Sequence, residues 1–412
     1  MASLSSTTED GDALSERLYF PTFTRHLSIL LVVQSLAGST SAVAFLVSGF
    51  AGTSLAPVRI LATLPMSAFV IGVAISSSLA AWTMSRAGRK TGHLIGASIG
   101  FSGAACACVA LTIHSFWGYS ASCVMLGVGT AFNNQVRFTA AEGAPPAQKG
   151  LVHSWILMCG IFAAILGPAV AAYGRKMDLF GGAAEYAGSY VLLMVMLLAS
   201  ISLLAFLPSL GTTTQTASDS GKISFRHVLS KPVFWVAATS GTTSFAVMTL
   251  LMSATPMQMT MIEHFSQESA VFTIQSHIVA MFLPSLFSGF FVRALGLRRL
   301  IYCGLLIFAL CVPVAYFAGS LHGYWWALVL LGIGWNFLFL AGSTLLSLSF
   351  SGPDRFAAQG LNDTMVFGTQ AMASLAAGWL LYTVGWQSMV LIPIPFLVLV
   401  LALVIGFGRK VI

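Results

Sequence analysis

The sequence predicts an all-α integral membrane protein in which twelve transmembrane helices form two six-helix bundles, each a parallel repeat of the other. Three observations predict this fold. Only 8% of the 412 residues are charged, whereas 57% are hydrophobic. The hydrophobic residues gather into segments that are long enough to cross a bilayer. Short motifs of the first half return in the second half, in the same order and at nearly constant spacing.

The low charge content excludes a soluble protein, because soluble domains carry about 25% charged residues. The net charge of +7 does not indicate a nucleic-acid partner, since the basic residues lie in short clusters and form no extended stripe. Residues 1–25 have no early apolar core, so no cleavable signal peptide is expected. The six cysteines lie inside apolar segments, a pattern that predicts neither a metal site nor another cofactor.

A membrane-spanning helix needs about 20 mostly apolar residues. The polar intervals between such stretches divide the chain into twelve candidate crossings. These lie at 27–50, 57–84, 93–113, 116–136, 151–173, 187–207, 232–254, 269–292, 300–319, 323–346, 360–384 and 387–408.

Basic residues between the crossings predict the orientation. With the N-terminus inside, 16 of the 19 Lys and Arg residues are cytoplasmic, and the other three, Arg59, Arg175 and Lys176, are outside. The positive-inside rule therefore places both termini in the cytoplasm. The Ser/Thr-rich stretch 208–231 then becomes a cytoplasmic linker. The predicted divisions are the tail 1–25, the N-terminal bundle 26–207, the linker 208–231, the C-terminal bundle 232–408 and the tail 409–412.

Three motifs recur about half a chain apart, which indicates an internal duplication. Six crossings separate the two basic turns, an even number, so both turns lie on one side of the membrane. The halves are therefore parallel repeats, related by an axis along the membrane normal. The matching pieces are Leu126-Gly127-Val128-Gly129 with Leu331-Gly332-Ile333-Gly334 at an offset of 205, Gly150-Leu151 with Gly360-Leu361 at 210, and Gly88 with Gly296 at 208.

This organisation resembles the major facilitator superfamily over the whole chain. The signature of that family, between helices 2 and 3, reads G-x3-D-R-x-G-R-R or close to it, and Arg86, Gly88, Arg89 and Lys90 match it here. The resemblance implies that Arg86, Arg89 and Lys90 take part in gating. The aspartate of the signature steadies the outward-open state in the family, but Ser85 stands in its place, so that contact is not expected.

Transport by such a fold needs polar groups at a site between the bundles. The resemblance places Gln34, Asn133, Asn336 and Gln370 on cavity-lining helices or beside them, and Arg137 shares a helix face with Asn133. These five are the substrate-binding candidates. Two alternatives stay open. Arg137 either holds an anionic group or Glu142, or anchors at the lipid headgroups. Asn336 contacts either a ligand or another helix.

Two titratable residues are candidates for gating and coupling. Asp363, expected in the first turn of helix 11, aligns with His153 through the Gly-Leu register. We hypothesise that this pair flanks a cytoplasmic gate whose charge depends on protonation. The alternative is that Asp363 partners the helix dipole or Arg355, and that His153 is a packed or interfacial histidine.

The sequence thus predicts a secondary active transporter that moves a small organic solute across the inner (cytoplasmic) membrane by alternating access. An ion gradient, with protons as the candidate ion, would drive it, and a monomer embedded in the lipid bilayer would suffice. The motifs Ala62-Thr63-Leu64-Pro65 and Gly334-Trp335-Asn336-Phe337 resemble a bacterial branch that we associate with vitamins such as riboflavin and with siderophores. An amphiphilic compound is a further candidate substrate.

Other classes of function fit less well. A drug or metabolite efflux antiporter and a transporter-like solute sensor remain alternatives. A membrane enzyme would need clustered histidines or paired carboxylates, and a channel would need a charged or carbonyl-lined filter. The sequence shows neither pattern, and it has no phosphate-binding loop for ATP.

Overall fold

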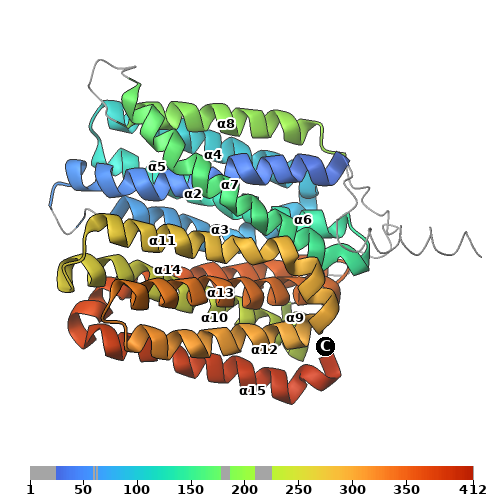
Figure 1. Ribbon diagram of the computed structural model, residues 1–412. Helices are drawn as coiled ribbons and strands as arrows, with labels where there is room; N and C mark the ends of the chain where they lie inside the picture. Colours follow the sequence, from blue (N-terminus) through green and yellow to red (C-terminus); the bar gives the residue numbers. More distant parts are fainter. Residues whose placement is uncertain (1–24, 59–60, 62–63, 178–185, 209–224, 412) are drawn as a thin grey trace, which may run out of the picture.

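The computed structural model describes residues 25–58, 61, 64–177, 186–208 and 225–411. Within these ranges the chain forms helices and connecting turns and no strand. Figure 1 shows two groups of helices, one blue to green and one yellow to red. The described chain begins and ends on the same side, the right-hand end of Figure 1, which we call the termini face. Residues 1–24 of the predicted tail, most of the linker 208–231 and Arg59 lie outside the described residues.

The N-terminal half contributes seven α-helices and a short 3-10 turn. They are α2 (Arg25–Leu55), α3 (Leu64–Ala87), α4 (Arg89–Thr112), α5 (Phe116–Asn134), α6 (Val136–Glu142), η2 (Pro146–Gln148), α7 (Lys149–Lys176) and α8 (Ala187–Ala205).

The C-terminal half repeats the pattern with longer continuous helices. Its elements are α9 (Phe225–Ser230), α10 (Pro232–Met257), η3 (Gln258–Ile262), α11 (Gln267–Phe282), η4 (Leu283–Phe287), α12 (Ser288–Tyr316), α13 (Leu321–Ser349), α14 (Asp354–Leu391) and α15 (Pro393–Val411).

The number of crossings agrees with the predicted fold class. Ten described segments are long and apolar enough to span a membrane. One of them, Asp354–Phe407, breaks at Gly385, where φ is 80° and ψ is 166°, and therefore contains two crossings. Helix α5 has 19 residues and packs between α3 and α4. With the second crossing of 354–407 and α5 added to the ten, the total is twelve.

The predicted start of the eleventh crossing is wrong. Helix α14 begins at Asp354, not near residue 360, so Asp363 lies in the third turn and not in the first. The polar residues before position 360 do not form a loop. Asp354 and Arg355 are partly exposed, whereas Ala357, Ala358 and Gln359 are buried, and the helix continues through all of them.

Close helix packing explains why the Leu-Gly-x-Gly motif is duplicated. A Cβ atom on Gly127 of α5 would lie 2.1 Å from the carbonyl oxygen of Phe69 in α3, and one on Gly332 of α13 would lie 2.8 Å from that of His277 in α11. The two contacts correspond, since 127 + 205 = 332 and 69 + 208 = 277. Each bundle thus uses a glycine at the same helix crossing, because small residues let membrane helices approach closely.

The two basic turns also share one backbone shape. Gly88 has φ 83° and ψ 160°, and Gly296 has φ 72° and ψ 164°. Glycine adopts this region readily, whereas other residues are strained there. This match supports the duplication at the level of the backbone.

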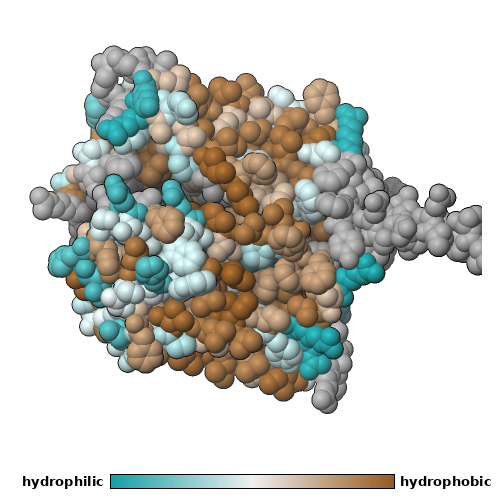
Figure 2. Space-filling model, in the orientation of Figure 1, coloured by the Kyte–Doolittle hydropathy of each residue, from teal (hydrophilic) through white to brown (hydrophobic). Residues whose placement is uncertain are grey.

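The outer surface suits a lipid environment. Figure 2 shows hydrophobic side chains gathered across the middle of the visible face and hydrophilic ones towards both ends. Large apolar side chains stand exposed, with Ile75 and Trp379 each 66% accessible. Between the bundles, α14 packs on α3, and α7 packs on α11, α12 and α13.

Candidate functional site

Polar residues from both halves meet between the bundles at the termini face. The helix break after Asn134 helps to bring them there, because α5 ends at that residue and α6 begins at Val136. Gln135, at the break, is fully buried, and Arg137 is 5% exposed. The break thus directs a polar amide and a guanidinium inward, towards α14.

An ion pair between Arg137 and Asp363 lies at the centre of this region. The Arg137 Nη2 atom donates to Asp363 Oδ1, and the two side chains are 6% and 1% exposed. Gln135 Nε2 donates to Asp363 Oδ2 over 2.7 Å, and Asn362 Nδ2 donates to Oδ1 over 2.9 Å. Asp363 therefore pairs with a residue of the other bundle and not with Arg355. Because Arg137 is buried in this pair, it does not reach the lipid headgroups.

Aromatic rings enclose the guanidinium of Arg137. Its Cζ atom lies 4.5 Å from the ring centroid of Phe138 and 4.9 Å from that of Phe339. Cation–π contacts of this kind strengthen when water is excluded. The two rings thus compensate in part for the burial of a charge that would be costly if it were isolated.

A second cluster surrounds Arg89, which opens α4. Arg89 forms a bidentate ion pair with Glu142, in which Nε donates to Oε2 over 3.1 Å and Nη2 donates to Oε1. It also donates to Gln359 across the bundle interface over 2.5 Å and to Gln135 over 3.3 Å. Gln135 joins the two clusters. We call Arg89, Gln135, Arg137, Glu142, Gln359 and Asp363 the termini-face network.

Arg86 and Lys90, the other basic residues of the family signature, have different contacts. The guanidinium of exposed Arg86 lies 4.9 Å from the ring centroid of Trp82. Lys90 donates to the carbonyl oxygen of Ala205 at the end of α8, over 2.6 Å. Among the three, only Arg89 joins the termini-face network.

The lowered pKa of Glu142 should make the stability of the folded protein depend on pH. Burial opposes ionisation of this carboxyl, but the charges and hydrogen bonds of Arg89, with Arg355 3.5 Å away, outweigh it and hold the pKa of Glu142 below its ordinary value of 4.5. A carboxyl with a lowered pKa in the folded state stabilises that state above its ordinary pKa, and the contribution is lost as the pH falls through the folded-state pKa.

We therefore expect the melting temperature of the purified protein to fall as the pH drops below 4.5, and Glu142→Gln to flatten this dependence. Thermal melting at a series of pH values would measure it. The matched control is Glu142→Asp, which keeps the charge and should keep the slope. A Glu142→Gln variant with the wild-type slope would show that Glu142 does not account for it.

His153 makes a second contact between the bundles. Its Nε2 atom and Ser347 Oγ of α13 are 2.8 Å apart and hydrogen-bonded, and Lys149 Nζ donates to the carbonyl oxygen of Ser347 over 3.2 Å. At the offset of 210 given by the Gly-Leu pairs, His153 corresponds to Asp363, since 153 + 210 = 363. The two corresponding residues thus each make a contact across the bundle interface, charged for Asp363 and hydrogen-bonded to a serine for His153.

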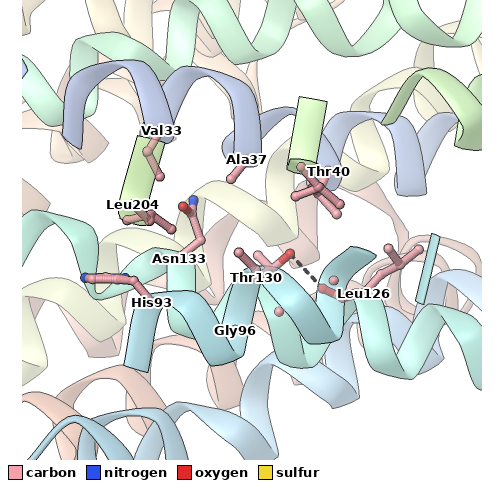
Figure 3. A pocket seen from close by; sticks show the side chains of 13 residues that line it. Val33, Ala37, Thr40, His93, Gly96, Leu126, Thr130, Asn133 and Leu204 are labelled. Carbon is pink, nitrogen blue, oxygen red and sulfur yellow. Dashed lines mark hydrogen bonds between the residues drawn. The ribbon is translucent and has the colours of Figure 1, made fainter. Parts of the chain in front are cut away.

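Gln34 and Asn133 lie together inside the N-terminal bundle. Asn133 Nδ2 donates to Gln34 Oε1 over 3.3 Å. Asn133 borders a small cavity with Thr40 of α2 and His93 of α4 (Figure 3). The cavity volume is about 20 Å³, which is room for one or two water molecules. The cavity is therefore too small for an organic solute in this conformation.

The two remaining candidates lie in the C-terminal bundle. Asn336 is fully buried, and its Nδ2 atom donates to the carbonyl oxygen of Met281 over 2.6 Å and to Ser285 Oγ over 2.7 Å. This contact holds α13 against α11 and η4. Gln370 is half-buried on α14, two helical turns after Asp363.

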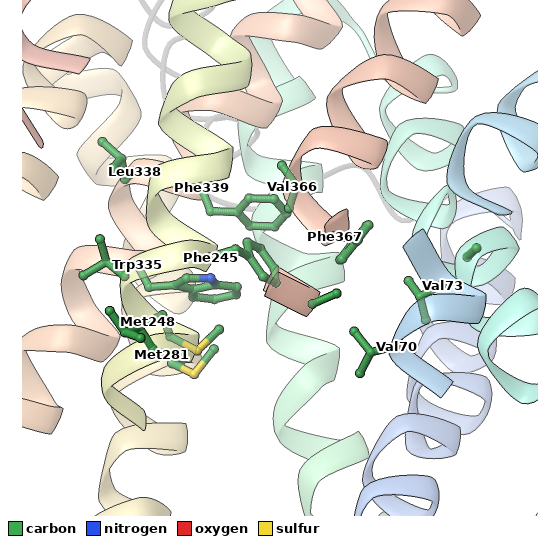
Figure 4. Packing of buried hydrophobic residues seen from close by; sticks show 14 of the residues in the cluster. Val70, Val73, Phe245, Met248, Met281, Trp335, Leu338, Phe339, Val366 and Phe367 are labelled. Atoms are coloured by element: carbon green, nitrogen blue, oxygen red, sulfur yellow. The ribbon is translucent and has the colours of Figure 1, made fainter. Parts of the chain in front are cut away.

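An aromatic cluster lies beyond the Arg137–Asp363 pair and was not foreseen from the sequence. It consists of Phe245 from α10, Trp335 and Phe339 from α13, and Phe367 from α14 (Figure 4). The ring of Phe245 lies 5.3 Å from Trp335, 4.9 Å from Phe339 and 5.5 Å from Phe367, all edge to face. Trp335 and Phe339 are stacked, with an interplanar angle of 24°. A sequence signal existed, because Trp335 and Phe339 are four residues apart and share a helix face.

The sequence of this chain matches a known protein family. Residues 27–339 match the Major Facilitator Superfamily. The chain belongs to this superfamily. Among curated proteins, riboflavin transporter RfnT of Brucella anthropi is 31% identical over 379 residues, which cover 92% of this chain and 94% of the relative. The uncharacterised superfamily transporter YdeG of Bacillus subtilis is 28% identical and covers 86% of this chain and 84% of its own.

Solved superfamily structures share the fold. FucP in the outward conformation superposes with a TM-score of 0.75 at 16% identity, covering 95% of this chain and 99% of FucP. A bacterial homologue of the iron transporter ferroportin, in an outward-facing state, gives a TM-score of 0.73 at 16% identity, covering 94% of this chain and all of that one. The family match and the curated relatives, together with the fold, make the protein a multi-pass membrane transporter of small solutes and not an enzyme.

Within this superfamily member, the signature turn does not supply the negative charge at the bundle interface. Ser85, in the aspartate position of the signature, donates back to the carbonyl oxygen of Trp82 over 2.6 Å. The acidic groups come instead from Glu142 at the end of α6 and Asp363 on α14. The basic partner Arg89 is retained, and its acidic partner is on another helix.

Proposed function

We propose that this protein is a secondary active transporter of riboflavin, or of a solute with a similar flat ring, across the cytoplasmic membrane. The observation that carries the proposal is that the inter-bundle polar contacts described above all lie at the termini face. In a carrier with two bundles, contacts on one face keep that side closed while the site is accessible from the other. The curated relative RfnT, a riboflavin transporter by name, supports the substrate.

The distribution of basic residues supports a cytoplasmic location for the termini face. Arg89, Arg137, Lys149 and Arg355 all lie near it, in agreement with the positive-inside rule. In this proposal, the conformation described is closed to the cytoplasm. The termini-face network acts as the cytoplasmic gate, and its contacts must separate when the bundles rock to release solute.

Asp363 is the proposed coupling group. Protonation would remove its charge and weaken the hydrogen bonds that Arg137 and Gln135 donate to it, and within the network these two residues have no other acidic partner. The energy that keeps the gate closed would then depend on a proton, as coupling between an ion and a conformational change requires. His153, hydrogen-bonded to Ser347 in the corresponding place, would keep the second contact independent of an acidic residue.

The test is uptake by the purified full chain in proteoliposomes. We expect labelled riboflavin inside the vesicles to drive counterflow of external riboflavin, and an imposed proton gradient to accelerate net uptake in the wild type. Asp363→Asn should retain counterflow but lose the acceleration, and His153→Gln should retain both. Counterflow of a siderophore or an amphiphilic drug, without counterflow of riboflavin, would show that the proposed substrate is wrong. Binding without counterflow of any solute would indicate a sensor.

A further inference from the structure

The strongest unexplained feature between the bundles is the indole N–H of Trp335. Trp335 is 3% exposed, and its Nε1 atom has no hydrogen-bond partner among the described residues. Buried tryptophans usually satisfy this donor. The neighbours of Trp335 in the aromatic cluster are rings, which offer no strong acceptor. A donor left open in this way is well placed for an acceptor that arrives with a ligand.

The aromatic cluster also lies where the bundles meet. Figure 4 shows Phe245, Trp335 and Phe367 directed towards the side of α3 that carries Val70 and Val73. On the other flank, the ring of Phe282 lies 5.8 Å from Trp335. That ring occupies the space beside Gly160 of α7, where a Cβ atom would lie 2.5 Å from it. The cluster is therefore bordered by both bundles, and a movement of one bundle would uncover it.

From these contacts we infer that the aromatic cluster is the subsite for a planar heteroaromatic ring, which packs against the ring of Phe339 and accepts a hydrogen bond at its edge from Trp335 Nε1. The inference rests on the proposed transport function and adds the part of the solute that is recognised. The cluster contains no charged side chain, so the ring it holds is neutral. Its in-plane nitrogen or carbonyl oxygen supplies the missing acceptor.

Phe339 connects this subsite to the cytoplasmic gate. One end of the stack is Trp335, and the face of Phe339 also contacts the guanidinium of Arg137, 4.9 Å away. A ring inserted beside Phe339 would therefore displace a group that contacts the Arg137–Asp363 pair. Solute binding and gate opening would share one side chain.

Equilibrium binding to the purified full chain, measured by calorimetry, tests the subsite. The probes are riboflavin, lumichrome (the ring system without the ribityl chain) and ribitol (a sugar alcohol with no ring). We expect lumichrome to bind with an affinity within roughly tenfold of riboflavin, and ribitol not to compete, because the ring provides the contacts.

Two variants on α13 distinguish the contribution of the Trp335 hydrogen bond to binding from that of side-chain packing. Trp335→Phe keeps an aromatic side chain but removes the N–H, and should weaken riboflavin and lumichrome binding by roughly tenfold, the effect of one hydrogen bond. Trp326→Phe is the matched control, because Trp326 lies on α13 with 53% of its surface exposed, and should leave the affinity unchanged. Equal melting temperatures of the two variants would show that packing is intact.

The outcomes separate this inference from the proposed function. If the wild type transports riboflavin but Trp335→Phe binds it as well as the wild type does, the subsite is wrong and the transport function stands. If riboflavin is not bound but another planar heteroaromatic compound is bound in a Trp335-dependent manner, the proposed substrate is wrong and the subsite stands. Competition by ribitol as strong as that by lumichrome would overturn the subsite.

Discussion

Removing one partner of the buried Arg137–Asp363 pair should destabilise the protein severely. Arg137→Met leaves the Asp363 carboxylate with amide donors alone, and Asp363→Leu leaves the Arg137 guanidinium without an acidic partner in a site where both side chains are at most 6% exposed. An uncompensated buried charge costs about 3–5 kcal/mol. We expect each single variant to melt at a clearly lower temperature and to lose the acceleration of uptake by a proton gradient.

The double variant Arg137→Met/Asp363→Leu makes this prediction specific. It removes both charges, so it should recover most of the stability that each single variant loses, because apolar replacement of a buried pair is often neutral or stabilising. Thermal melting and a double-mutant cycle would measure the coupling. The acceleration of uptake should not recover to the same degree, because the contact that opens and closes is gone.

The control for this experiment is a more exposed ion pair in the same region. Arg355 lies 3.5 Å from Glu142, and its side chain is 34% exposed. Partly exposed pairs contribute about 1 kcal/mol or less, so Arg355→Gln should change the melting temperature little. Strictly additive effects of Arg137→Met and Asp363→Leu would contradict the pairing seen in the structure.

The fold could be predicted from the sequence because its signals are local. Long apolar runs, basic turns and glycines at a repeated spacing can each be recognised in a short stretch of sequence. The bilayer then allows few architectures for such apolar runs. A further repeat went unrecognised, in the form of Ser-x-x-Gly-Tyr at Ser115 and Ser320, since 115 + 205 = 320. Both serines accept a backbone N–H at the start of a helix, from Gly118 and Gly323.

The candidate site was harder to predict because its contacts are between distant parts of the chain. The sequence offered Glu142, five residues away, as a partner for Arg137, but the pair forms with Asp363, 226 positions away. Glu142 contacts Arg89 instead. No feature of the sequence near Arg137 or Glu142 indicates that each would pair with a residue of another helix. These pairings depend on how α6 and α14 approach each other across the bundles, which is fixed by packing and not by sequence spacing.

The side-chain environment of the amides could not be inferred either. Asn336 and Asn133 are both buried amides on corresponding helices of the repeat, but Asn336 binds the backbone of α11 and Asn133 binds a side chain of α2. Periodicity places an amide on a helix face only approximately, and a buried amide takes whichever partner is nearest, because an unsatisfied one is costly.

Gly127 should be among the glycines of the first bundle that tolerate substitution least. Its hypothetical Cβ atom would lie 2.1 Å from the carbonyl oxygen of Phe69 and 2.9 Å from the amide nitrogen of Val73. Both atoms belong to the backbone of α3, so no side-chain rotation can relieve the clash, and α3 and α5 must move apart. We expect Gly127→Ala to cost on the order of 3 kcal/mol and Gly127→Val to prevent folding.

Two other glycines provide graded controls for this prediction. At Gly332, the corresponding residue of the second bundle, the nearest backbone atom would be 2.8 Å from the added Cβ, so Gly332→Ala should destabilise less. Gly368 on α14 has no atom within 4 Å of such a Cβ, and Gly368→Ala should be neutral or stabilising, because alanine favours a helix over glycine by up to about 1 kcal/mol.

Melting temperature and the monodisperse fraction of the detergent-purified variants would rank the three substitutions. The order Gly127→Ala, Gly332→Ala, Gly368→Ala from least to most stable follows from the backbone distances alone. Helix propensity by itself would make all three favourable. A Gly127→Ala variant as stable as Gly368→Ala would therefore mean that α3 and α5 do not approach at this glycine. The Leu-Gly-x-Gly repeat would then need an explanation other than helix packing.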